Sequence, residues 1–181
     1  MDVSGLRDRK FDLILGRLMV PVTDPAMADL SIESLFHEHL VIAAGRRNPW
    51  ARRSEIDLAE LVDEPWVLPP ADSWNYRSLA EAFTARGLSP PKSTLVTHST
   101  SLRTYLLAHG PHLTSFGSSA VLLNQNRQLL KLLPVDLPVR SWHIAVLRLA
   151  NRTLSPVVDR FVECAREVAK TIAVGRQVGR A

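Results

Sequence analysis

The sequence has a single cysteine, Cys164, and no run of apolar residues that approaches the length of a membrane span. One cysteine excludes a disulfide within the chain and fits a reducing compartment, so we expect a cytoplasmic protein. A membrane-crossing helix needs roughly 18–20 consecutive apolar residues. Residues 1–10 carry five charged side chains and lack the apolar segment of a signal peptide. We therefore expect no contact with a membrane.

The motifs of common catalytic and cofactor sites are also missing. With eight glycines, the chain contains no Walker-type phosphate loop and no GxGxxG motif, and CxxC, HExxH and GxSxG are absent as well. His37-Glu38-His39 would place two imidazoles on one face of a strand, but no third ligand follows at a recognisable spacing. Cys164 lies beside the apolar stripe of a helix, where packing is favoured over a nucleophilic role. We expect no catalytic residue, no cofactor and no metal ion.

The positive charge of the chain is modest and dispersed. The net charge is +4, and 18 of the 22 basic residues are arginine. One dense cluster exists, formed by Arg46-Arg47 and Arg52-Arg53. A charge of this size permits nucleic-acid binding without requiring it. Of the two interpretations of the cluster, a phosphate contact and a solvated loop, the loop is favoured.

Strand-like and helix-like segments alternate along the chain. With 181 residues, 46% of them hydrophobic, the chain is long enough for one domain or two small ones with a real core. The residues before Phe11 indicate the end of a helix. The predicted strands are 11–16, 30–36, 39–44, 66–68, 94–97, 113–116, 129–135 and 142–149. The predicted helices are 57–62, 73–86, 99–109, 118–123 and 155–172. This order predicts an α/β fold with largely parallel sheets.

The sequence also predicts the caps and the buried positions of these elements. Asp57 is expected to cap the helix 57–62, and Asp72 or Ser73 the helix 73–86, with Gly87 at its C′ position. The expected apolar positions are Leu102, Tyr105, Leu106 and Leu107 in 99–109, and Val157/Val158, Phe161/Val162, Ala165, Val168 and Ile172 in 155–172. The run Leu13 to Leu15 suggests a strand buried on both faces.

Polar residues gather where the predicted strands end. They are Gly16-Arg17, Pro69-Pro70 with Asp72-Ser73, His98-Ser99-Thr100, and Ser115 to Ser118. In open α/β sheets ligands bind at the carboxyl ends of strands, where helix N-termini offer free backbone N–H groups. The pattern predicts a pocket for a small polar molecule and shows no catalytic arrangement.

The order and spacing of several motifs resemble the regulatory part of LysR-type transcriptional regulators. The segments that carry the resemblance are Arg7 to Gly16, Ile56 to Leu61, Glu64 to Leu68 and Ser101 to Gly110, across residues 6–172. Two segments depart from the family pattern: Asn48-Pro49-Trp50-Ala51 replaces HPLA, and Pro111 to Gly117 replaces lGia.lP. The strings Trp66 to Pro70 and Leu15 to Leu18 look most similar to the subgroup that regulates a galactose-binding protein.

The resemblance implies a fold and a division of the chain. It implies two Rossmann-like α/β subdomains joined by two crossovers, as in type 2 periplasmic binding proteins. Subdomain I would comprise 1–65 and 139–181, and subdomain II would comprise 66–138. Compared with the family pattern, the chain lacks the helix-turn-helix domain, the first strand and most of the first helix. Contact with DNA is then expected only through that absent domain, and a homodimer would be weakened because family dimers commonly use the first helix.

The resemblance also implies a site and a function. A small polar effector, a sugar or an organic acid, would bind in the cleft between the subdomains as the co-inducer of a regulator. Subdomain I would contribute Gly16, Arg17 and Leu18, and subdomain II would contribute Pro69, Pro70, His98, Ser99, Thr100, Phe116 and Gly117. Arg17 would hold a carboxylate with two hydrogen bonds. The alternatives are a surface arginine at position 17 and simple helix capping by Ser99 and Thr100. The alternative functions for the chain as a whole are a free-standing solute-binding protein and an enzyme on a related scaffold.

Overall fold

The computed structural model describes residues 2–18 and 23–178, and beyond residue 172 only the backbone. The chain divides into two compact units. Unit 1 consists of Met1–Glu38 and Ser141–Ala181, and unit 2 of His39–Arg140. The chain therefore passes from unit 1 to unit 2 at residues 38 and 39, whereas the sequence predicted this boundary at residue 65. Residues 39–65 pack with 66–138 because their strand pairs with strands of unit 2.

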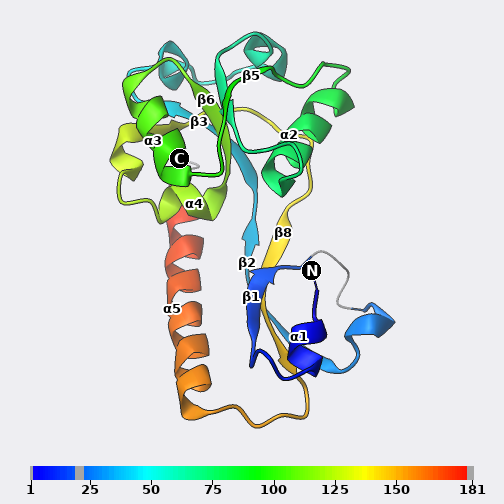
Figure 1. The fold of residues 1–181 in the computed structure, drawn as a ribbon. Helices are drawn as coiled ribbons and strands as arrows, with labels where there is room; N and C mark the ends of the chain where they lie inside the picture. The colour runs from blue at the N-terminus through cyan, green and yellow to red at the C-terminus, as the bar shows by residue number, and fades with distance from the viewer. Residues whose placement is uncertain (1, 19–22, 179–181) are drawn as a thin grey trace. The chain divides into compact units, whose positions relative to one another are not determined.

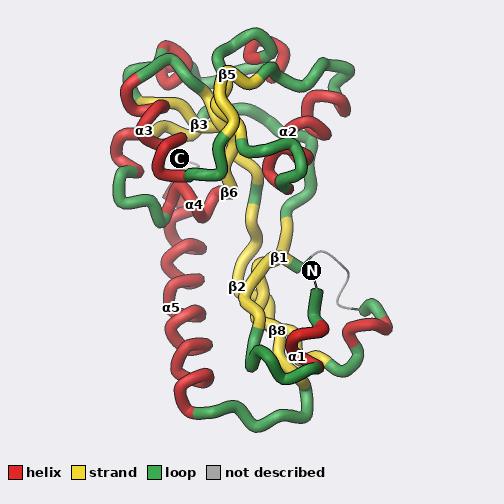
Figure 2. Tube along the Cα trace, viewed as in Figure 1, coloured by secondary structure: helices red, strands yellow, loops and turns green. Residues whose placement is uncertain are grey.

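Unit 1 is built on a three-stranded antiparallel sheet in the order β1-β8-β2 (Figures 1 and 2). Its elements are the helix α1 (Ser4–Arg7), the strands β1 (Ile14–Arg17), β2 (Leu30–Glu38) and β8 (Trp142–Leu149), and the long helix α5 (Pro156–Val178). Ile14 pairs with Leu147 and Glu38 with Trp142. The helix end predicted before Phe11 is confirmed by α1. The expectation of a parallel sheet is wrong for this unit, because β8 is antiparallel to both β1 and β2. Strand β1 lies at the edge of the sheet, and its Leu15 is 44% exposed.

The two faces of the unit 1 sheet are covered differently. On one face, α1 and the segment before β2 enclose a small apolar cluster in which Leu6 is completely buried. Arg7 anchors α1 by donating from Nε and Nη2 to the two carboxylate oxygens of Asp29, at 2.8 Å each. On the other face, α5 lies along β2, where Arg166 donates to both oxygens of Glu33 at 2.6 and 2.8 Å. Of the apolar stripe predicted for α5, Val162 and Ile172 are buried, whereas Val168 is 46% exposed and Ala169 takes its place on the buried face.

Unit 2 contains a five-stranded mixed sheet in the order β5-β4-β6-β3-β7 (Figure 1). The strands are β3 (Leu40–Gly45), β4 (Trp66–Leu68), β5 (Ser93–Val96), β6 (Leu113–Gly117) and β7 (Leu130–Leu132). The helices are α2 (Trp74–Ala85), α3 (Thr100–His109) and α4 (Ser118–Leu122). Strand β4 runs parallel to β5 and β6, whereas β3 is antiparallel to β6 and β7. The predicted parallel arrangement therefore holds for β4, β5 and β6.

The core of unit 2 forms around the indole of Trp66, which is fully buried. The ring meets Phe83 of α2 edge to face, with 6.1 Å between the ring centroids. Its Nε1 donates to the carbonyl oxygen of Leu61 at 2.8 Å, so the polar atom of the indole is satisfied inside the core. This contact ties β4 to the 3₁₀ turn Leu58–Leu61 that precedes it.

Side-chain caps define where the helical elements of unit 2 begin. Asp57 and Glu60 form a reciprocal capping box around the turn Leu58–Leu61, which is 3₁₀ rather than the predicted α-helix. Ser73, one of two predicted candidates, caps α2 by accepting from the Tyr76 N–H. Gly87 follows the last turn of α2 with φ +72, as its predicted C′ position requires. These local contacts fix the loops that enter and leave the sheet.

Candidate functional site

Three strands of unit 2 bring most of the predicted binding residues to one edge of its sheet. Because β4 is parallel to both β5 and β6, the carboxyl ends of the three strands share an edge. Pro69-Pro70 follows β4, His98-Ser99-Thr100 follows β5, and Phe116-Gly117 ends β6. The Thr97 N–H donates to the Leu68 carbonyl at 2.9 Å and holds the first two loops together. Their role in binding remains a prediction.

The loop between β5 and α3 is ordered by its own side chains. The Ser99 hydroxyl accepts from the Leu102 N–H at 3.1 Å, and the Ser99 N–H donates to the Thr97 hydroxyl at the same distance. Ser99 is therefore the N-cap of α3, which is the structural alternative stated for it. Thr100 is the first residue of the helix, at a position where backbone N–H groups lack intrahelical partners. His98, Ser99 and Thr100 are all exposed.

The end of β6 contributes backbone rather than side chains. Phe116 is 1% exposed and belongs to an apolar cluster with Leu107 of α3. Gly117 is the N-cap of α4 with an ordinary extended backbone, and Pro69 after β4 is also buried. The side chain of Phe116 therefore packs in the core. At this edge of the sheet, β6 is followed directly by the first residues of α4.

Arg103 is a functional candidate that the sequence analysis missed. Of the apolar residues predicted for the helix 99–109, Leu107 is buried, but Leu102 and Tyr105 are 41% and 60% exposed. The buried face of α3 instead consists of Arg103, Thr104 and Leu107. Arg103 is 4% exposed, and burial lowers its pKa to about 10. The signal available in the sequence was the presence of two polar residues, Thr114 and Ser115, in an otherwise apolar strand, whereas their contact with Arg103 is visible only in the structure.

In unit 1 the three predicted residues lie at the end of β1 and differ in environment. Arg17 is half-buried, which lowers its pKa, while the nearby carboxylate of Glu38 opposes that shift. The Arg17 guanidinium lies 6.0 Å from the ring centroid of Trp142. Leu18 is 8% exposed and packs in the apolar cluster under α1, so its side chain is part of the core. A Cβ built on Gly16 meets only Ile14, at 3.9 Å.

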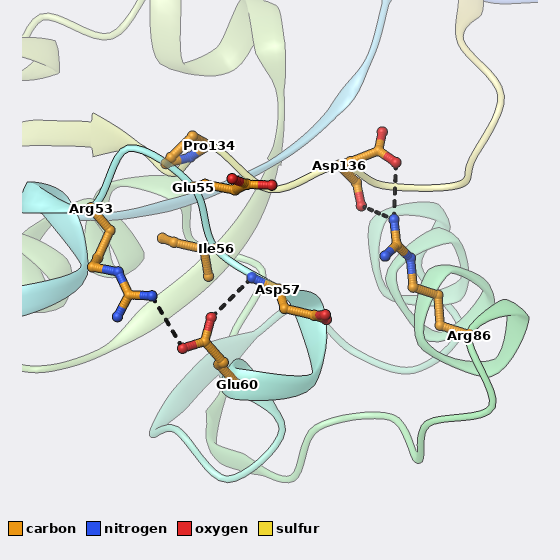
Figure 3. A pocket seen from close by; sticks show the side chains of 8 residues that line it. All are labelled: Arg53, Glu55, Ile56, Asp57, Glu60, Arg86, Pro134 and Asp136. Atoms are coloured by element: carbon orange, nitrogen blue, oxygen red, sulfur yellow. Dashed lines mark hydrogen bonds and ion pairs between the residues drawn. The ribbon is translucent and has the colours of Figure 1, made fainter.

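Two hollows of the described chain lie away from these residues. A hollow of about 500 Å³ in unit 2 is lined by Arg53, Glu55, Ile56, Asp57, Glu60, Arg86, Pro134 and Asp136 (Figure 3). Its charged side chains pair with one another: Arg53 meets Glu60 at 3.3 Å and Arg86 meets Asp136 at 2.9 Å. A second hollow of about 370 Å³ in unit 1 includes Arg9, Asp29 and Arg152. Neither contains a predicted site residue, and the ion pairs of the first are exposed to solvent.

Two further properties bear on function. Within residues 2–18 and 23–178, no group of three or more histidine, cysteine, aspartate or glutamate side chains is placed to hold a metal ion. None of the helices in the same ranges has the length and apolar character needed to cross a membrane.

Comparison with known proteins shows what the two units resemble. The family model described as "LysR substrate binding domain" matches residues 2–170. No curated protein sequence matches the chain. The regulatory domain of CcmR from Synechocystis PCC6803, solved in complex with 2-PG, is 21% identical, with a TM-score of 0.68. The match covers 92% of this chain and 77% of that one.

Two other solved structures share the fold. The BenM effector binding domain with its effector benzoate is 21% identical, with a TM-score of 0.63, over 97% of this chain and 75% of that one. CbnR, a LysR family transcriptional regulator, is 18% identical, with a TM-score of 0.62, over 92% of this chain and 55% of that one. The chain thus spans about three quarters of the two regulatory domains and about half of CbnR. With the family model matching residues 2–170, the chain belongs to the LysR substrate-binding domain family, with the fold of type 2 periplasmic binding proteins.

Proposed function

We propose that this chain is the effector-binding part of a LysR-type transcriptional regulator and that it senses a small polar metabolite. Residues of both units would contact the ligand, namely Gly16 and Arg17 at the end of β1 and the loops after β4, β5 and β6. The observation that carries the proposal is the shared carboxyl edge of three parallel strands in a chain of this family. Such an edge is where α/β sheets bind ligands.

The chemistry of the candidate residues suits binding. The start of α3 offers backbone N–H groups and the partial positive charge of a helix N-terminus. Arg17 is the second cationic element; partial burial lowers its pKa, and the carboxylate of Glu38 opposes that shift. The related structures carry 2-PG and benzoate as ligands. An organic acid or a sugar, which needs a few oriented polar groups, fits this set.

The structure refines which side chains would act. Ser99 would position α3 through its cap, and Thr100 would present its backbone N–H and hydroxyl. The buried side chains of Leu18 and Phe116 would support the site from the core. Catalysis, a cofactor and a metal ion are not part of the proposal, because the candidate residues include no acid–base pair. We further propose a homodimer, contact with DNA only through a helix-turn-helix domain of a longer regulator, and action in the cytoplasm.

A thermal-shift screen tests the proposal directly. The 181-residue chain is melted with a panel of sugars and small organic acids, and at least one compound should raise the melting temperature in a saturable way. The same compound should lose most of its effect on Arg17→Ala. A matched control is Arg52→Ala, which removes an exposed arginine of the loop after β3. Equal binding by wild type and Arg17→Ala would refute the role of Arg17, and no shift by any compound would contradict ligand binding by this chain.

A further inference from the structure

Arg103 is a buried cation at the start of α3. It lies in the first turn of the helix, and its Nη1 donates to the Ser115 carbonyl of β6 at 2.9 Å and to the Thr114 hydroxyl at 3.4 Å. The guanidinium also lies 4.6 Å from the ring centroid of Phe116. These contacts hold the guanidinium against β6 and leave it little freedom to move.

No carboxylate balances this charge in the described part of the chain. No ion pair involves Arg103, and the lowering of its pKa has burial as its single cause, without an opposing acidic group. With a pKa near 10 the side chain is still charged at neutral pH. Buried cations are normally paired, because removing an isolated charge from water is unfavourable. Arg103 is therefore a charge whose partner is missing from the residues that the structure describes.

One edge of the guanidinium makes no hydrogen bond to the described residues. Nε is sealed from solvent and has no hydrogen-bond partner. Nη2 makes no hydrogen bond to the described residues either, but it is not among the sealed atoms. Elsewhere in this chain the same Nε/Nη2 edge binds a carboxylate with two hydrogen bonds, in Arg7 with Asp29 and in Arg166 with Glu33. An edge with two unused donors matches the planar, paired oxygens of an anionic group.

The position of Arg103 connects this edge to the candidate site. Residues three and four apart on a helix are neighbours on one face. Thr100 and Ser99 therefore lie directly above Arg103, at the N-terminus of α3, where the helix dipole also favours an anion. The positive end of the helix dipole and the guanidinium of Arg103 therefore both lie at the first turn of α3, one arising from the backbone and the other from a side chain.

We propose that the Nε/Nη2 edge of Arg103 binds a carboxylate or phosphate group of the effector, beside the first turn of α3, and that the atoms that cover Nε in this structure move aside when the anion binds. This inference rests on the proposed function and narrows it, because it makes the effector an anion and gives unit 2 its own charged contact. Arg103 also has a purely structural alternative, in which it only ties α3 to β6. That alternative predicts a loss of stability on substitution but no change in anion affinity.

Nitrogen-15 spectra of the arginine Nε–H groups in the 181-residue chain distinguish the two. Sodium phosphate and sodium succinate are titrated separately at constant ionic strength, and glucose serves as the uncharged probe. We expect the Arg103 signal to shift in a saturable way with at least one anion and not with glucose. Whichever anion acts identifies phosphate or carboxylate as the group bound. An Arg103 signal that neither anion moves would overturn the inference, and this result needs no variant.

Variants add a second readout. Arg103→Lys keeps the charge but lacks the two-nitrogen edge, so the affinity for the anion should fall about tenfold or more, as for a lost charge-assisted hydrogen bond. Arg52→Lys is the matched control and should bind as the wild type does. Unchanged affinity in a folded Arg103→Lys protein would leave only the structural alternative. If the panel yields an Arg17-dependent ligand that is uncharged and leaves Arg103 unaffected, the inference fails while the proposed function stands.

Discussion

Gly45 at the end of β3 is expected to be intolerant of any side chain, because the backbone of α3 passes directly over it. A Cβ at this position would lie 2.0 Å from the carbonyl oxygen of Leu107 and 2.9 Å from its carbonyl carbon. The obstacle is main chain, so no side-chain rotation can relieve it. Restoring even a 3.0 Å contact requires α3 to move by about 1 Å away from the sheet.

The cost of Gly45→Ala follows from this geometry. Overpacking a tight interior costs about 1–3 kcal/mol, and a clash with backbone belongs at the upper end, so we expect about 3 kcal/mol. Since α3 carries Ser99, Thr100 and Arg103, its displacement should also weaken ligand binding. Gly87 offers a contrast, because a Cβ there meets nothing within 4 Å and only its φ of +72 is unfavourable for alanine. Gly87→Ala should cost about 1 kcal/mol.

Urea denaturation followed by tryptophan fluorescence measures both effects. Three of the four tryptophans, Trp50, Trp66 and Trp74, belong to unit 2, so the signal reports mainly on the unit that is perturbed. Gly16→Ala should unfold almost as the wild type does, because its Cβ has open space. The expected order of destabilisation is Gly45→Ala, then Gly87→Ala, then Gly16→Ala. A Gly45→Ala protein as stable as Gly87→Ala would refute the reasoning from close approach.

Three other outcomes follow from particular contacts. Ser99→Ala removes the cap of α3 and should cost about 1 kcal/mol in urea denaturation, with Ser99→Asp recovering most of it; no loss would mean that the cap contributes nothing in solution. Trp66→Phe removes the shorter of two hydrogen bonds to the Leu61 carbonyl and leaves only the Glu64 N–H at 3.4 Å, so it should cost about 1 kcal/mol by the same assay, and a neutral result would contradict a contribution from the indole bond. The hydrogen bonds from Arg166 lower the pKa of Glu33, so their stabilisation is present at neutral pH and is lost as pH falls below the ordinary value of 4.5, through the pKa of the folded state. Glu33→Gln should therefore show a smaller loss of stability across acid pH than the wild type, as seen in melting curves recorded at successive pH values.

Local chemistry made much of the fold predictable. The caps at Asp57, Ser73 and Ser99 depend on contacts within three residues, and the C′ glycine at 87 depends on one φ angle. Helical periodicity predicts Val162 and Ile172 on the buried face of α5, although Ala169 rather than Val168 lies between them there. Residues after β4, β5 and β6 could be assigned to one edge because the order of elements favours parallel neighbours. Each of these inferences uses information that lies close together in the sequence.

Features that depend on distant partners could not be predicted in this way. The run Leu13 to Leu15 looked buried on both faces, but β1 is the edge of an antiparallel sheet because β8, more than 120 residues later, pairs with it. The chain changes unit at Glu38 rather than at residue 65 because β3 finds β6 and β7 as partners. Arg103 was overlooked because its face of α3 became the buried one only through contact with Thr114 and Ser115.

The most direct test of the proposed function maps a ligand onto the backbone amides. The panel compound with the largest thermal shift is titrated into the nitrogen-15-labelled 181-residue chain. The account predicts saturable shifts at residues 16–18, 98–100 and 116–117 and at Ala71, with one affinity for all four segments; Ala71 stands for its segment because Pro69 and Pro70 have no backbone N–H. Shifts confined to 53–60 and 134–136, around the hollow in Figure 3, would contradict it, because the ligand would then bind outside the edge formed by β4, β5 and β6.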